Sequence, residues 1–194
     1  MNKEYQHTIK SSITVSGVGL HTGTQVDMTF HPASANHGYK FRRIDLEGKP
    51  VIEADADLVT DTGRGTTITK NNASVSTIEH TLAALVGLGI DNVMIDLNGP
   101  ETPIMDGSSK EFIRALSSVG MEMQDAEREY IVINENITFK DPLRKTEITV
   151  MPADDYQVTV MIDFDSKVLG KQHATLDHIS EFSGQIANSR TFCF

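Results

Sequence analysis

The alternation of apolar and polar residues over the first sixty positions predicts β structure. The segment "SSITVSGVGLHTGTQVDMTFHPA" alternates in this way and is interrupted by Gly17, Gly19 and Gly23, a pattern typical of short strands joined by turns. "GYKFRRIDL" continues the pattern after the turn "ASANHG", and the glycines of "TDTGRGTTIT" indicate an irregular strand edge. We therefore expect this part of the chain to form a sheet.

A first amphipathic helix is predicted after these strands. An apolar stripe is formed by residues at i, i+4, i+7 and i+8, namely Ile78, Leu82, Leu85 and Val86. Ser76 and Glu79 have the S-x-x-E spacing of a capping box, and Gly87 and Gly89 are placed to end the helix. The pattern therefore predicts a helix that starts at "STIEH".

A buried strand and a second helix are expected next. "NVMIDL" is apolar enough to be a strand on which a helix packs, and "NGPETPIMDGSS" has the composition of a long turn. Ser108 and Glu111 form a second predicted capping box, and the helix is expected to run from Ser108 to Val119 with Gly120 as its stop.

Three short segments of the chain recur in the same order. "IKSSITV", "FHPA" and "RIDL" are echoed by "INENITF", "VMPA" and "MIDF", which favours an α+β fold of duplicated two-layer sheet/helix domains. We expect a first domain over 1–124, a polar linker over 125–129, and an incomplete second domain over 130–194. The apolar ending "RTFCF" resembles a strand cut in mid-domain, so a fragment of a longer protein is predicted.

Composition and net charge argue against several classes of protein. The formal net charge of −10 over 194 residues argues against nucleic-acid binding, which depends on neutralising phosphates. Cys193 is the single cysteine, so no internal disulfide can form and a reducing compartment is expected. No signal peptide is evident, and the apolar stretch "LAALVGLGI" is too short to span a bilayer. These features predict a cytoplasmic protein without a transmembrane segment.

Glu79 and His80 are the first candidates for chemistry, with two interpretations. A glutamate that closes a capping box beside a surface histidine is an ordinary helix start. At about 100° per residue, however, His80 lies nearly opposite the apolar stripe and so faces solvent or a partner domain. A helix N-terminus favours the neutral imidazole that a metal requires, and an adjacent glutamate can act as a base.

Four motifs carry a resemblance to a known family. "SGVGLHTG", "STIEHTLAALVGLGIDN", "NGPETPIMDGSS" and "RTFCF" occur in the order found in the UDP-3-O-acyl-N-acetylglucosamine deacetylases of lipid A biosynthesis. The chain is similar to the N-terminal part of these zinc-dependent hydrolases. The resemblance implies two similar α+β domains with an active site between them and a UDP-linked acylated amino sugar as substrate.

The resemblance also implies roles for individual residues. Glu79 would be the general base, His80 a ligand of one Zn²⁺ ion, and Thr191 the donor to the oxyanion. The substrate contacts implied are Leu20 and Phe192 at the acyl passage, Asp163, Phe164 and Phe194 at the uridine-diphosphate end, and Lys145 at a phosphate. The other zinc ligands would lie beyond residue 194, so the chain alone is expected to be inactive. A further fused C-terminal domain is an open possibility.

Other interpretations of the sequence remain besides a zinc-dependent deacetylase. His173 and Asp177 in "HATLD" have the i, i+4 spacing of a helical metal pair, although surface polar residues are the stronger interpretation. The alternative function is a non-catalytic binding or assembly module, which would keep the fold of the family but lack the rest of its active site. Small-molecule kinases also use α+β layers, but no convincing glycine-rich phosphate loop is present.

Overall fold

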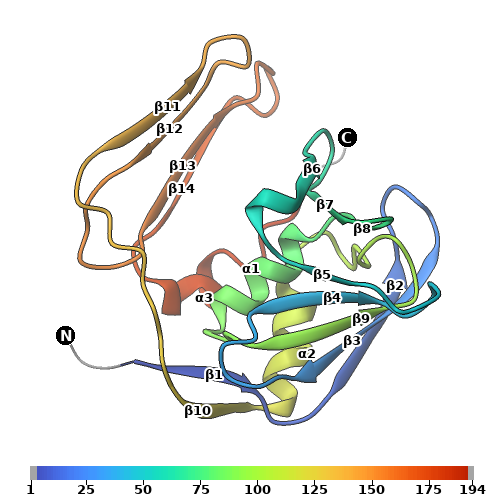
Figure 1. Cartoon of the computed structure of the whole chain (residues 1–194). Coiled ribbons are helices and arrows are strands. Elements are labelled where there is room, and N and C mark those ends of the chain that lie inside the picture. The colour runs from blue at the N-terminus through green and yellow to red at the C-terminus, as the bar shows by residue number, and fades with distance from the viewer. Residues whose placement is uncertain (1–3, 192–194) are drawn as a thin grey trace. The chain divides into compact units, whose positions relative to one another are not determined.

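The computed structural model describes residues 4–191, which form two compact units. The first unit comprises the chain up to Glu127 together with the segment from Ser180 onward, and the second is Arg128–Ile179. Figure 1 shows the helices and strands of both units. None of the helices in residues 4–191 has the length and apolar character needed to cross a membrane.

A five-stranded sheet is the centre of the first unit, with strand order β2-β3-β9-β4-β5. The strands are β2 (Ile13–Val18), β3 (Gln25–Pro32), β4 (Tyr39–Arg43), β5 (Val51–Glu53) and β9 (Val93–Leu97). The predicted buried strand "NVMIDL" is thus confirmed as the central strand, antiparallel to β3 and parallel to β4.

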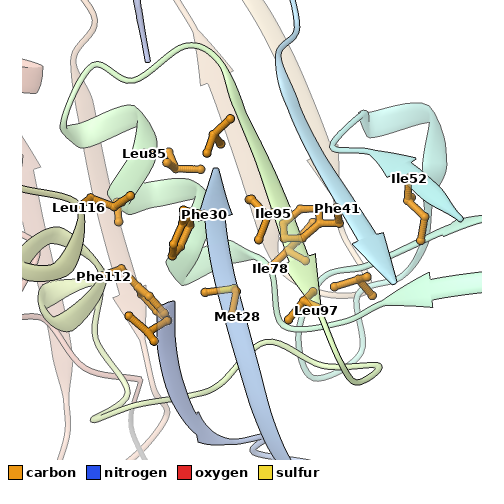
Figure 2. Close-up of a cluster of buried hydrophobic side chains, with 14 of the residues drawn as sticks. Met28, Phe30, Phe41, Ile52, Ile78, Leu85, Ile95, Leu97, Phe112 and Leu116 are labelled. Atoms are coloured by element: carbon orange, nitrogen blue, oxygen red, sulfur yellow. The ribbon is translucent and has the colours of Figure 1, made fainter. Parts of the chain in front are cut away.

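One face of this sheet and two helices enclose the core. Val26, Met28 and Phe30 are buried on β3, whereas the intervening Asp27 and Thr29 are more exposed, as the period of two requires. Figure 2 shows Met28 and Phe30 of this strand on the side of the sheet that faces Leu85 of α1 (Glu79–Gly87) and Phe112 and Leu116 of α2 (Lys110–Val119). Fully buried members from both layers are Met28, Phe30, Phe41, Ile52, Leu85, Ile95, Leu97, Phe112 and Leu116. The prediction of an α+β fold is confirmed.

Smaller elements complete the first unit. A three-stranded sheet contains β6 (Val59–Asp61), β7 (Thr67–Lys70) and β8 (Ala73–Val75), and β1 (Tyr5–Ile9) pairs with β10 (Met121–Glu127). A 3-10 helix, η1 (Ala56–Leu58), precedes β6. The last helical elements are a 3-10 helix, η2 (Ile179–Glu181), and a single turn of α-helix, α3 (Phe182–Gln185).

The start of α1 differs from the predicted capping box. The N-cap is Ile78 and no side chain caps the helix. The Ser76 hydroxyl instead donates to the carbonyl of Pro100, because Ser76 bridges to the 100–102 segment rather than to the helix. Val86, predicted within the apolar stripe, is exposed, and Thr81 and Ala84 are buried beside Leu85 instead.

The start of α2 also differs from prediction, whereas its end agrees. The helix begins at Lys110, two residues later than expected, and Ser108 Oγ accepts a hydrogen bond from the Lys110 N–H. Glu111 pairs with Arg114 at 2.6 Å instead of returning to the cap. Gly120 is the C-cap with φ of 72°, a conformation that favours glycine.

The second unit consists of two antiparallel hairpins. They pair β11 (Ile137–Asp141) with β12 (Thr146–Val150) and β13 (Val158–Asp163) with β14 (Lys171–Leu176). His173 lies in β14, so the helical His173–Asp177 metal pair is wrong. Residues 125–127 of the expected linker belong to β10. The domain limits at 124 and 130 and the duplication stay predictions.

Candidate functional site

Glu79 and His80 are the first two residues of α1, and both are half-buried. The turn that leads into the helix contains Thr77, which is buried and has φ of 60°. This left-handed conformation is rare for a β-branched residue, so the surrounding contacts must hold it. The sequence motif is therefore presented at a helix N-terminus, where a carboxylate is favoured by the helix dipole.

The carboxylate of Glu79 is oriented by the segment between β6 and β7. Its Oε2 accepts a hydrogen bond from the N–H of Thr66, with 3.0 Å between the two atoms. A Cβ on Gly65 would lie 3.2 Å from Glu79 Oε1 and 3.4 Å from Thr77 Oγ1. The backbone at Gly65 thus packs closely against this side chain and restricts where the carboxylate can point.

His80 and Thr191 contact the same turn, residues 107–109, at the start of α2. Ser109 Oγ donates to the His80 carbonyl at 3.0 Å, and the Thr191 N–H donates to the Gly107 carbonyl at 2.7 Å. The ring of the half-buried His80 forms no hydrogen bond with a protein group within residues 4–191. The turn therefore brings together two candidates that are more than one hundred residues apart in sequence.

Electrostatics and packing fix this turn and the segment that carries Thr191. The Ser108 hydroxyl donates to Asp106 at 2.7 Å and lowers the pKa of that carboxyl, to which the positive charge of Arg190 also contributes. Upstream, Phe182 of α3 packs on α1 so closely that a Cβ on Gly87 would lie 2.1 Å from its ring. Residues 182–191 are thereby held to α1 and to the 107–109 turn.

Leu20 lies in the turn between β2 and β3 and is 49% exposed. The Nε2 atom of the neighbouring His21 lies 3.2 Å from the Arg64 carbonyl, within hydrogen-bond distance. The Leu20 turn is therefore adjacent to the 64–66 segment that orients Glu79.

The other predicted substrate contacts fall outside the first unit. Lys145, Asp163 and Phe164 belong to the second unit. Asp163 accepts from the Asp165 N–H, and this bond, with the attraction of Lys171 and Lys145, lowers the pKa of the Asp163 carboxyl. Lys145 and Asp163 thus interact electrostatically within one unit. Phe192 and Phe194 lie outside the described residues.

The metal-binding side chains of the described residues do not meet the requirements of a zinc site. A catalytic zinc site takes three protein ligands and keeps one open position. Residues 4–191 contain no group of three or more His, Cys, Asp or Glu side chains that could hold a metal ion. His80 supplies one imidazole, so the described residues by themselves do not make a complete zinc site.

Three residues around Glu79 and His80 received no site role from the sequence, namely Thr66, Thr77 and Ser109. Thr66 and Ser109 hydrogen-bond to the motif, and Thr77 forms the turn before it. Each lies in a segment that contains glycines or opens a helix, which is the only signal that marks them in the sequence.

The sequence is similar to that of a known protein family and of several enzymes. A family model described as "LpxC: UDP-3-O-acyl N-acetylglycosamine deacetylase" matches residues 6–194. The bifunctional enzyme LpxC/FabZ of Bacteroides thetaiotaomicron is 47% identical over 189 residues, which are 97% of this chain and 41% of that relative. The UDP-3-O-acyl-N-acetylglucosamine deacetylases of Geobacter sp. (strain M21) and Methylococcus capsulatus are 41% and 43% identical.

The matched length differs between the two kinds of relative. The alignments cover 98% and 97% of this chain for the Geobacter and Methylococcus proteins, and 62% of each of those relatives. The chain thus spans 41% of the bifunctional relative and 62% of the deacetylases. Because the family model matches nearly its whole length, the chain belongs to the UDP-3-O-acyl N-acetylglycosamine deacetylase family.

Proposed function

We propose that the chain is the N-terminal part of a zinc-dependent deacetylase of lipid A biosynthesis. The enzyme would hydrolyse the acetamide of UDP-3-O-acyl-N-acetylglucosamine and release acetate. Family membership and the names of the relatives support this assignment. The bifunctional relatives support a further proposal, that a second enzymatic domain is fused downstream.

The observation that carries the proposal is the fixed carboxylate of Glu79 beside the imidazole of His80. The Thr66 N–H occupies Oε2, so Oε1 is left to take a proton from the attacking water. A base that is already oriented needs little rearrangement during the reaction. The hydroxyl of Thr191 would donate to the oxyanion, and its backbone is held on the 107–109 turn that also contacts His80.

Zinc would be held by the His80 ring and by ligands outside residues 4–191. When bound, zinc lowers the pKa of a water and polarises the carbonyl under attack. Because the described residues supply only one ligand beside Glu79, the 194-residue chain alone is proposed to be inactive.

The substrate would extend from the acetamide in two directions. Leu20 and Phe192 would contact the acyl chain, and the exposure of Leu20 leaves its side chain accessible to an apolar group. Asp163, Phe164 and Phe194 would contact the uridine-diphosphate end. Lys145 would contact a phosphate, although its ammonium also attracts Asp163.

Zinc content and acetate release test this function. Both should be measured on the 194-residue chain and on the protein expressed from its complete reading frame. We expect one zinc and turnover for the complete protein, and neither for the chain. A complete protein that is metal-free and inactive would instead favour a non-catalytic binding or assembly module.

A further inference from the structure

Glu101 is a buried carboxylate that the proposed chemistry does not use. Glu101 is 1% exposed. The carboxylate accepts hydrogen bonds from the N–H of His21 at 3.0 Å, the N–H of Thr22 at 2.8 Å and the hydroxyl of Thr77 at 2.9 Å. One side chain therefore joins the turn between β2 and β3 to the residue that precedes the Ile78 cap of α1.

The backbone around Glu101 is fastened to the entrance of α1. The Ser76 N–H donates to the Pro100 carbonyl at 2.9 Å, and the Thr102 N–H donates to the Ser76 carbonyl at 3.1 Å. The Thr102 hydroxyl donates to the carbonyl of Thr77. The hydroxyl and the carbonyl of the left-handed Thr77 are thus held by the 101–102 segment, which stabilises a turn that is otherwise unfavourable.

The β2–β3 turn is shaped to fit the same carboxylate. The Gly19 N–H donates to the Thr24 carbonyl and the Gly23 N–H donates to the Gly19 carbonyl, both at 3.0 Å. A Cβ on Gly19 would meet Thr22 Oγ1 and lie 2.5 Å from Glu101 Oε2, so a larger residue there would displace one or both of these side chains. The turn presents Leu20, and His21 contacts the Arg64 carbonyl.

We propose that Glu101 is a positioning residue that fixes the Leu20 turn and the Glu79–His80 motif relative to one another. Two connections run from its carboxylate to Glu79. One passes through Thr77 into α1, and the other through His21 and Arg64 to the Thr66 N–H on Glu79.

The positioning role of Glu101 depends on the free-energy cost of burying a charged group. A carboxylate at this depth is tolerated only while its hydrogen-bond donors stay in place, so the donors and the segments that carry them are held as a unit. The proposal rests on the proposed function, because it assigns the acyl contact to Leu20 and the base to Glu79.

The first test is hydrogen exchange measured by mass spectrometry on the complete protein. Glu101→Gln keeps the shape of the side chain but removes its charge and one acceptor. We expect peptides that cover residues 17–26 and 64–79 to exchange about tenfold faster or more, since the substitution removes the charge from hydrogen bonds that hold both segments. Peptides from residues 27–32 of β3 and from β9 should be unchanged. The control is Glu111→Gln, which removes a carboxylate paired with Arg114 on the surface of α2.

The second test is steady-state kinetics of acetate release. Glu101→Gln should retain zinc, lower kcat about tenfold and raise KM for the acylated substrate, since both Glu79 and the Leu20 turn are displaced. A merely structural role would lower the apparent kcat by the fraction of unfolded protein and leave KM unchanged. Thr77→Val removes one donor, and its effect should be non-additive with Glu101→Gln.

The proposal is overturned if the exchange of both peptides and both kinetic constants stay at wild-type values, or if exchange accelerates uniformly over the whole first unit. A wild-type protein that released no acetate would refute the proposed function alone, because the exchange pattern would still show whether Glu101 holds the two segments.

Discussion

Glu79 and Thr66 are joined by a hydrogen bond of 3.0 Å between the carboxylate Oε2 and the backbone N–H. The two residues belong to different elements, since Glu79 opens α1 and Thr66 precedes β7. The direction in which the proposed base points is therefore set by a loop, and changes in that loop should affect catalysis more than stability.

Gly65→Ala tests this dependence. The added Cβ would lie 3.2 Å from Glu79 Oε1, so the carboxylate must move by a few tenths of an ångström. We expect acetate release by the complete protein to fall about tenfold with little change in melting temperature, because small misplacements of a catalytic group are costly. Gly63→Ala is the matched control, since its Cβ would meet only the side chain of Asp61. Equal activity of the two variants would contradict the account.

Gly87 and Phe182 should show energetic coupling. A Cβ on Gly87 would overlap the Phe182 ring at 2.1 Å, so Gly87→Ala should destabilise the protein by about 1–3 kcal/mol through overpacking. In a Phe182→Ala background the same substitution should be nearly neutral. A double-mutant cycle by chemical denaturation measures this difference. Additive effects would mean that α3 does not pack on α1.

The stability contributed by Glu101 should depend on pH. Burial raises the pKa of this carboxyl, but hydrogen bonds from the amides of Thr22 and His21 and the hydroxyl of Thr77 outweigh burial and place the pKa below its ordinary value of 4.5. A lowered folded-state pKa stabilises the protein above pH 4.5 and loses that effect as pH falls through the folded-state value. The difference in unfolding free energy between wild type and Glu101→Gln should therefore shrink below pH 4.5. A constant difference would exclude this linkage.

Leu85 and Val86 are adjacent in α1 but should differ sharply in their contribution to stability. Leu85 is fully buried, whereas Val86 is 44% exposed. Leu85→Ala should cost about 2–5 kcal/mol, and Val86→Ala should stay within about 0.5 kcal/mol of wild type. Thermal denaturation distinguishes the two. A large loss at Val86 would indicate that a partner covers this face of the helix.

Leu85 and Val86 also show what hydrophobic periodicity can and cannot predict from the sequence. Periodicity located α1 and the central strand β9, because burial of an apolar face imposes a regular spacing. It could not separate Val86 from the buried stripe, since Thr81 and Ala84 fill those positions through packing against the sheet. The predicted capping boxes failed for a related reason. Ser76 is held in a β-bridge to Glu101, outside the N-cap position, and Glu111 forms an ion pair with Arg114.

The candidate site was predictable only in part. The order of four motifs marked Glu79, His80 and Thr191, but the contacts that orient them come from Thr66, Ser109 and Gly107. Those contacts are long-range and mostly involve backbone atoms, which leave no pattern of residue types in one sequence. The role of Glu101 could not be predicted for the same reason, because its hydrogen-bond donors include two backbone amides about eighty positions away.

The most direct test of the account compares two substitutions at adjacent residues in the complete protein. Glu79→Gln should keep its zinc and reduce acetate release by about 10²–10⁴-fold, as expected for loss of a general base. His80→Ala should lose both zinc and activity, because it removes a metal ligand. Circular dichroism should confirm that both variants are folded. If both variants retain zinc and full turnover, Glu79 and His80 are only the start of a helix, and the proposed active site is wrong.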